Sequence, residues 1–230
     1  MLELLPDLIT LIGLELGFQS IYLAATGRPY LSARIFFLAL FFDYLDGLAA
    51  RLLKVESPRG EVLDRAVDRI NQCVAPAVLY ASLGGVIEST VASLLVIIGI
   101  VRLTIPKDSR YFRGAPLFIP ALMIVCSVLS GIEIPWYAIL PFILITGLPI
   151  PYPRSQATSI GTESRWRTVL WNLRPALPLA MALGPREVVE PLSLAILLFA
   201  VCYSVVGPIL AKKRWMGEPV WAKKSRRVGS

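Results

Sequence analysis

Long apolar stretches recur along the chain and alternate with short polar or proline-containing segments. Most are near the length at which a helix crosses a bilayer. Because backbone exposed to lipid must form its hydrogen bonds within its own segment, we predict that all of them are helices. There are eight, at about 5–25, 31–53, 60–83, 87–105, 115–130, 135–149, 166–183 and 192–211. Six are regular, whereas the sixth is short and the seventh is interrupted by polar residues and prolines.

Composition supports a membrane protein built from one helical domain. The 230 residues are 56% hydrophobic and only 17% charged, with a mean hydropathy of +0.66. A soluble domain carries more charge. No linker rich in glycine or serine divides the chain, so we predict an all-α polytopic membrane bundle, with an integral membrane domain over 1–211. Histidine is absent, which excludes histidine metal sites and a Ser-His-Asp triad.

Most of the net charge of +7 lies in the segment 212–230, after the last apolar stretch. A basic tail in this position is more typical of a cytoplasmic anchor near anionic lipid than of a nucleic-acid-binding arm, so we expect no nucleic-acid partner. With eight spans and both termini in the cytoplasm, Arg28 and Arg186 are the only basic residues in external loops. This asymmetry predicts a multi-pass protein of the cell membrane.

Four aspartates stand in an otherwise mainly apolar region. Asp43 and Asp46 are three residues apart and Asp64 and Asp68 are four apart, so each pair shares one helix face. The connection between the two helices is short, so they should be neighbours, with both pairs near the cytoplasmic side. Four close carboxylates repel one another, and burial disfavours their ionised forms. Oxygen ligands without histidine therefore predict a hard divalent cation, Mg²⁺ or Mn²⁺.

The residues around the aspartates indicate what such a cation would serve. Gly47, Ala50 and Gly60 are small and leave room for a ligand to approach the helix backbones. Arg51 offers a fork of donors suited to phosphate. Together they favour a substrate that carries a pyrophosphate. The alternatives are a structural ion-pair network involving nearby arginines, a divalent-cation transporter, whose carboxylates would line a pathway, and a non-catalytic membrane scaffold.

The full pattern resembles the signature of the CDP-alcohol phosphotransferases. It reads Asp43-x-x-Asp46-Gly47-x-x-Ala50-Arg51, then eight residues, then Gly60-x-x-x-Asp64-x-x-x-Asp68. The resemblance implies that an alcohol hydroxyl attacks the β-phosphorus of a CDP-linked lipid and that CMP leaves. It implies two metal ions held by Asp43, Asp46, Asp64 and Asp68, with Asp68 also the general base. It implies that Asp46, Gly47, Ala50, Arg51, Gly60 and Asp64 bind the CDP-lipid, and that the protein is a homodimer.

Shorter motifs outside the signature resemble the phosphatidylserine synthase branch of this family. In order they are VAPAVLY (74–80), YFRGAP (111–116), PIPYP (149–153) and VVGP (205–208). The chain departs from that branch at Arg65 and Arg69, and at 71–73, where Asn-Gln-Cys replaces Ser-Phe-Gly. Asp68 followed by Arg69 instead resembles the inositol-phosphate transferases.

These motifs favour L-serine as the acceptor, then inositol phosphate, then glycerol phosphate. Arg102, Arg110 and Arg113 are candidate acceptor-binding residues, although an ordinary basic cytoplasmic loop would carry the same residues. The donor is expected to be CDP-diacylglycerol or CDP-archaeol, since both present only hydrocarbon tails to an apolar surface.

Overall fold

Prolines and a serine set where two of the first helices begin. Pro29 occupies the first turn of the second helix, and Pro58 the first turn of the third. Proline suits these positions because an N–H in the first turn of a helix has no intrahelical acceptor, so its absence costs no hydrogen bond. The hydroxyl of Ser57 caps the third helix by accepting a hydrogen bond from the Gly60 N–H at 3.0 Å. Lys54 ends the second helix in the left-handed conformation, so the connection between the two is short.

A computed structural model describes residues 4–55, 57–104, 111–153 and 175–215. Its elements are α1 (Leu4–Ala25), α2 (Pro29–Leu53), α3 (Pro58–Arg69), the π-helix η1 (Ile70–Val74), α4 (Ala75–Leu83), α5 (Val86–Val101), β1 (Tyr111–Arg113), α6 (Phe118–Ser130), α7 (Trp136–Gly147), β2 (Pro151–Pro153), α9 (Ala176–Leu183) and α10 (Arg186–Trp215). The prediction of an all-α bundle is confirmed. A two-stranded antiparallel pair, β1 with β2, was not predicted.

The predicted segments match the observed helices closely. The third predicted segment is one continuous rod made of α3, η1 and α4. The first half of the seventh lies outside the described residues, and α9 represents the rest. The eighth begins earlier and ends later than predicted, because α10 continues through Pro191 and Pro208 and through the first residues assigned to the basic tail. The boundary of that tail stays a prediction.

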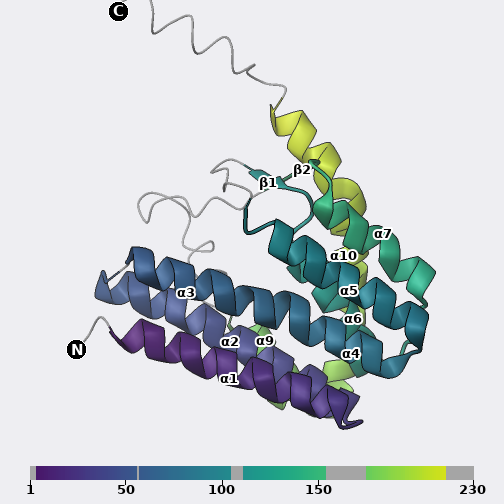
Figure 1. The fold of residues 1–230 in the computed structure, drawn as a ribbon, viewed down its shortest axis with the longest axis horizontal. Coiled ribbons are helices and arrows are strands. Elements are labelled where there is room, and N and C mark those ends of the chain that lie inside the picture. Colours follow the sequence, from purple (N-terminus) through teal and green to yellow (C-terminus); the bar gives the residue numbers. More distant parts are fainter. Residues whose placement is uncertain (1–3, 56, 105–110, 154–174, 216–230) are drawn as a thin grey trace, which may run out of the picture.

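Helix α6 is the centre of the bundle. Most of its side chains are buried, and it packs against α10, α2, α4 and α7. Around it, α1 lies along α2, α4 packs against α5, and α9 against α2. Figure 1 shows α1, α2 and α3 side by side at one end of the molecule, with α5, α7 and α10 at the other. The acidic motif therefore lies on helices that continue into a well-packed core.

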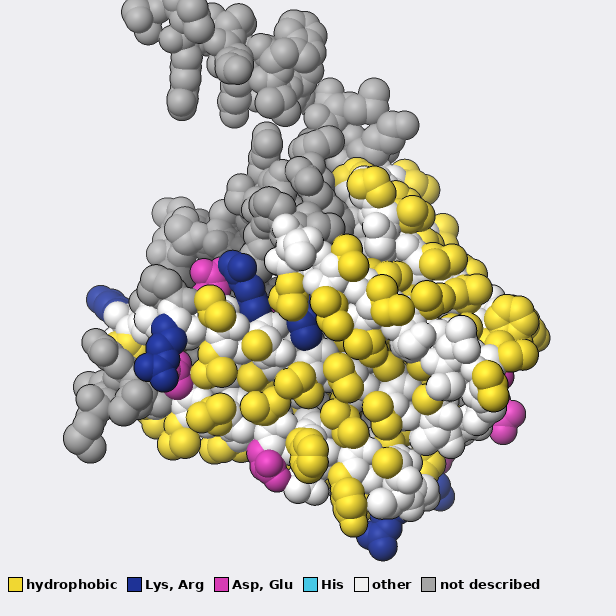
Figure 2. Space-filling view, in the orientation of Figure 1, with side chains coloured by type: hydrophobic (Ala, Val, Ile, Leu, Met, Phe, Trp, Pro, Cys, Tyr) yellow, Lys and Arg dark blue, Asp and Glu magenta, His cyan; other side chains and the backbone are white. Residues whose placement is uncertain are grey.

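The outer surface is apolar, as expected for helices that face lipid. Phe18, Tyr22, Leu198 and Ile209 are each at least half exposed, and hydrophobic side chains cover much of the face in Figure 2. Such large exposed apolar areas occur where a protein meets a membrane or another protein. Among the described helices, 5–25 and 186–211 are by themselves long and apolar enough to cross a bilayer. The orientation of the bundle in the membrane stays a prediction.

Candidate active site

Three of the four predicted carboxylates meet at the junction of α2 and α3. One oxygen each from Asp43, Asp64 and Asp68 lies within 4.8 Å of the other two. Two oxygens on opposite sides of an Mg²⁺ are about 4.2 Å apart, so small side-chain movements would let one cation contact all three. The donor set is entirely oxygen, which also suits Mg²⁺ or Mn²⁺. The residues present therefore fit a divalent cation.

Asp46 lies outside this cluster and is held by the first helix. Its side chain is buried, and its Oδ2 accepts a hydrogen bond from the Thr10 hydroxyl at 2.6 Å. The same hydroxyl also contacts the carbonyl oxygen of Pro6 at 3.0 Å. A buried carboxylate needs such donors to stay in place. Its predicted role as a metal ligand stays a prediction.

A π-helical turn follows Asp68 and arranges the residues beside it. The Gln72 side-chain amide donates a hydrogen bond to Oδ1 of Asp68, which fixes the orientation of that carboxylate. Because a π-turn holds one extra residue, the side chains after it are rotated relative to α3. Asn71, inside this turn, contacts α1, where its amide donates to the Gly13 carbonyl oxygen at 3.3 Å. π-turns often occur at functional sites.

The small residues of the motif do leave space, and the structure shows which atoms use it. A Cβ added to Gly47 would lie 3.6 Å from NH1 of Arg51, so the Arg51 guanidinium folds back over this glycine. A Cβ at Gly60 would lie 3.2 Å from the Ser57 hydroxyl and 3.4 Å from Oδ1 of Asp7. Ala50 lies on α2, one residue before Arg51. The role of these residues in binding a CDP-lipid stays a prediction.

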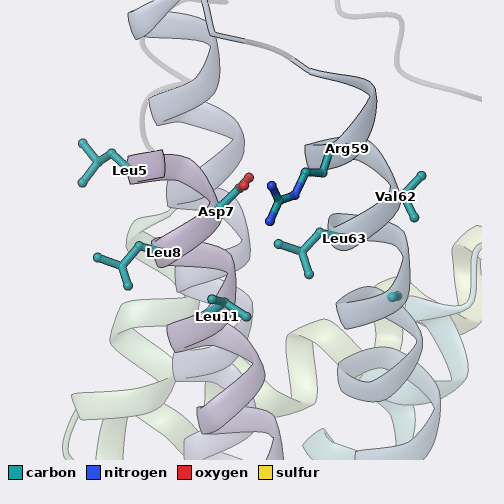
Figure 3. A pocket seen from close by; sticks show the side chains of 8 residues that line it. Leu5, Asp7, Leu8, Leu11, Arg59, Val62 and Leu63 are labelled. Atoms are coloured by element: carbon teal, nitrogen blue, oxygen red, sulfur yellow. The ribbon is translucent and has the colours of Figure 1, made fainter. Parts of the chain in front are cut away.

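An apolar groove of about 970 Å³ runs between the start of α1 and α3. Its walls are mainly aliphatic, and it has one acid and one base. The lining residues are Leu5, Asp7, Leu8, Leu11, Arg59, Val62, Leu63 and Ala66. Figure 3 shows Asp7 and Arg59 extending toward each other from the two helices, near the end of the groove at which α3 begins. The sequence does not predict this groove, because the groove depends on the distance between α1 and α3.

The three basic residues predicted to bind the acceptor lie in different parts of the chain. Arg102 caps α5, and its NH1 donates hydrogen bonds to the carbonyl oxygens of Ala115 and Thr146. Arg113 is in β1, which pairs with β2. Arg110 lies outside the described residues. Their acceptor-binding role stays a prediction.

Two residues that the sequence motif does not include also contact its aspartates. Gln72 is four residues after Asp68, and this spacing could have identified it as a neighbour of the base. Thr10 offered no such signal, since it is a hydroxyl residue in an apolar helix far from the motif in sequence. Its contact with Asp46 depends on the packing of α1 against α2.

Comparisons with known proteins agree with the signature. A family model described as CDP-alcohol phosphatidyltransferase matches residues 3–107, which include all four aspartates. Archaetidylserine synthase of Methanothermobacter thermautotrophicus is 30% identical over 170 residues, which cover 69% of this chain and 73% of that protein. CDP-diacylglycerol–serine O-phosphatidyltransferase of Saccharomyces cerevisiae is 33% identical over 135 residues, 49% of each chain.

A second CDP-diacylglycerol–serine O-phosphatidyltransferase, from Mycobacterium leprae, is 39% identical over 83 residues, which cover 36% of this chain and 28% of that protein. The matches to these two serine enzymes thus span about half of their length or less, whereas the match to archaetidylserine synthase spans nearly three quarters.

Proposed function

Because the chain belongs to the CDP-alcohol phosphatidyltransferase family, we propose that it transfers the lipid-phosphate group of a CDP-linked lipid to the hydroxyl of L-serine and releases CMP. The observation that carries the proposal is the meeting of Asp43, Asp64 and Asp68 from two neighbouring helices of a membrane bundle. The names of the relatives support serine over the other acceptors, since they describe serine transfer or archaetidylserine synthesis.

In the proposed reaction, Asp68 is the general base. It accepts the proton of the serine hydroxyl, whose oxygen forms the new bond to the β-phosphorus while the bond from that phosphorus to CMP breaks. Gln72 holds the carboxylate in one orientation through its amide. A divalent cation held by Asp43, Asp64 and Asp68 would supply charge neutralisation on the diphosphate. Apart from this proton transfer, the reaction needs mainly positioning and charge neutralisation.

The remaining motif residues are assigned to the donor. We propose that Asp46, Gly47, Ala50, Arg51 and Gly60 face the cytidine diphosphate, as the family resemblance implies. Asp46 is buried and bonded to Thr10, which supports the proposal that its side chain has a fixed position on this side of the site.

The apolar groove between α1 and α3 supports a lipid donor. It is lined mainly by aliphatic side chains and contains Val62 and Leu63, which immediately precede Asp64 on α3. A hydrocarbon tail in this groove would leave its diphosphate near the cluster of carboxylates. We further propose that this site faces the cytoplasm, which the basic segment 212–230 supports.

CMP release by the purified protein tests the proposal. The assay contains Mg²⁺ and CDP-diacylglycerol or CDP-archaeol, with L-serine, inositol phosphate and glycerol phosphate in parallel reactions. We expect CMP release with L-serine, and a fall of about 100-fold or more in Asp68→Asn, because a general base contributes about 10²–10⁴-fold. Glu133→Gln is the matched control, since Glu133 is an exposed acid in the connection between α6 and α7.

Two results would reject the proposal. One is the absence of CMP release with every acceptor, and the other is unchanged release by Asp68→Asn. Uptake of a divalent cation into sealed vesicles without any CDP-lipid would instead favour a transporter.

A further inference from the structure

Two arginines lie together on the α5 side of the acidic cluster. Arg69 is the last residue of α3 and directly follows Asp68, and Arg102 caps the C-terminus of α5. Their positive charges are near enough to repel each other. Gly99, one turn before Arg102, makes room for this arrangement. A Cβ there would lie 3.8 Å from Cδ of Arg69 and would collide with Sγ of Cys73 at 2.5 Å.

Arg69 has hydrogen-bond donors that the rest of the described chain does not use. Its Nε is buried and has no hydrogen-bond partner, and no ion pair to its guanidinium is found among the described residues. A buried donor without a partner is unfavourable, and two neighbouring cations without an anion add to the cost. A bound anion at this place would give the Arg69 donor a partner and offset the repulsion between the two guanidinium groups.

Arg102 is held in place by backbone groups and still has donors to offer. Both of its hydrogen bonds in the described structure come from NH1, to the carbonyl oxygens of Ala115 and Thr146. Among the described residues, no hydrogen bond involves its Nε or NH2, and the position of the guanidinium is already fixed. A fixed guanidinium loses little freedom when it binds a ligand.

The nearest carboxylate in the sequence is committed elsewhere. An oxygen of Asp68 lies with those of Asp43 and Asp64, and its Oδ1 accepts the hydrogen bond from Gln72. Asp68 and Arg69 thus project from adjacent positions of one helix toward different neighbours, the acidic cluster and α5. A small molecule placed between them would meet a base on one side and two guanidinium groups on the other.

We propose that Arg69 and Arg102 bind the negatively charged group of the acceptor, a carboxylate or a phosphate, and so place its hydroxyl beside Asp68. This inference rests on the proposed function. Guanidinium groups suit it because they bind both anions through paired, charge-assisted hydrogen bonds. In a small acceptor the hydroxyl and the anionic group are only a few bonds apart, which matches the adjacency of Asp68 and Arg69.

Steady-state kinetics of Arg69→Gln and Arg69→Lys test the inference. We expect Arg69→Gln to raise the KM for the acceptor about tenfold or more, because it removes charge-assisted hydrogen bonds, while the KM for the CDP-lipid stays unchanged. The KM of Arg69→Lys for the acceptor should lie between those of wild type and Arg69→Gln, since lysine keeps the charge but lacks the planar guanidinium group. Arg65→Gln is the matched control, because Arg65 lies one turn earlier on α3 and its Nε is likewise buried without a partner, but its guanidinium already has an ion pair, with Glu61.

An acceptor that lacks the negative charge shows whether Arg69 binds the acceptor or only supports the fold. L-serinamide keeps the hydroxyl of serine but lacks its carboxylate, so wild type and Arg69→Gln should use it equally poorly. An equal loss of kcat/KM for serine and serinamide in Arg69→Gln would overturn the inference. Inositol phosphate and glycerol phosphate, run in parallel, show whether the pair holds a carboxylate or a phosphate.

Calorimetric titration keeps the inference distinct from the proposed reaction. L-serine, inositol phosphate, glycerol phosphate and inorganic phosphate are titrated separately into the purified protein without CDP-lipid. We expect wild type to bind at least one of them and Arg69→Gln to bind it about tenfold or more weakly. Equal binding, or no binding by either protein, overturns the inference even if CMP release is observed. Binding lost in the variant supports it even if the wild type releases no CMP.

Discussion

Thr10 is the residue that joins the first helix to the acidic motif of the second. Its hydroxyl donates to Oδ2 of Asp46 at 2.6 Å, in a place where both side chains are buried. Without that donor the Asp46 carboxylate would lose its hydrogen bond from α1 but would still be buried. A hydrogen bond to a buried charged group contributes more than one between neutral groups.

We expect Thr10→Val to destabilise the protein by about 1–3 kcal/mol, because valine keeps the shape of threonine but removes the hydrogen bond from α1 to the buried Asp46 carboxylate. The measurement is thermal or denaturant unfolding of the detergent-purified protein. Thr26→Val is the matched control directly after the same helix, since Thr26 is exposed and its hydroxyl donates to the carbonyl oxygens of Tyr22 and Leu23. The control should change stability by less than about 0.5 kcal/mol. Equal effects of the two substitutions would contradict this role for Thr10.

At the scale of residues, the sequence predicted which carboxylates meet better than it predicted which side chains bond to them. The spacing of Asp43, Asp64 and Asp68 on two helices with a short connection was enough to predict that they meet. The hydrogen bond of Thr10 was beyond reach, because it depends on how α1 is positioned along α2, and hydrophobic periodicity does not determine that position. The folding of Arg51 over Gly47 was likewise not predictable, since a long side chain has many rotamers.

At the scale of helices, α1 and η1 approach each other at a glycine. A Cβ added to Gly17 would lie 1.8 Å from Oδ1 of Asn71, whereas one added to Gly13 would meet its neighbours at 3.6 Å or more. Asn71 cannot easily move away, because it is buried and its amide donates to the Gly13 carbonyl oxygen. The two glycines share one helix face but have different structural roles.

We therefore expect Gly17→Ala to destabilise the protein by about 1–3 kcal/mol through overpacking, and Gly13→Ala to be close to neutral. Unfolding of the two variants under the same conditions measures the difference. The double variant Gly17→Ala/Asn71→Ala should recover part of the loss, because the smaller side chain removes the collision. A Gly17→Ala protein as stable as Gly13→Ala would show that the η1 backbone moves aside without cost.

The elements that the sequence did not predict depend on tertiary contacts. The apolar pattern of 60–83 predicted one helix, and it is one rod, but a pattern of hydrophobicity does not reveal the extra residue that makes η1 a π-turn. The pairing of β1 with β2 joins two loops far apart in sequence. There the Tyr152 side chain is fully buried and its hydroxyl donates to the Ser204 carbonyl oxygen at 2.9 Å.

At the scale of the whole molecule, the cluster of Asp43, Asp64 and Asp68 couples the stability of the bundle to its proposed cation. Three carboxylates that converge from α2 and α3 repel one another across the junction of the two helices. A divalent cation between the three carboxylates attracts all of them and so offsets their repulsion. Because the cation binds the folded protein and not the unfolded chain, it stabilises the folded state by mass action. The chain should therefore be weakest without a cation, although none of its core residues changes.

We expect saturating Mg²⁺ or Mn²⁺ to raise the melting temperature of the wild type by about 5–10 °C over the value in a chelator. Binding at 100 times Kd is worth about 2.7 kcal/mol, and each kcal/mol shifts a chain of this size by about 2–4 °C. Asn at position 43 removes one of the repelling charges, so Asp43→Asn in the chelator should melt above the wild type and gain much less from the cation. Glu133→Gln, whose acid is far from the cluster in sequence and exposed, should behave like the wild type in both conditions. If wild type and Asp43→Asn gain equally from the cation, the three carboxylates do not form a cation site, and the convergence of α2 and α3 has another cause.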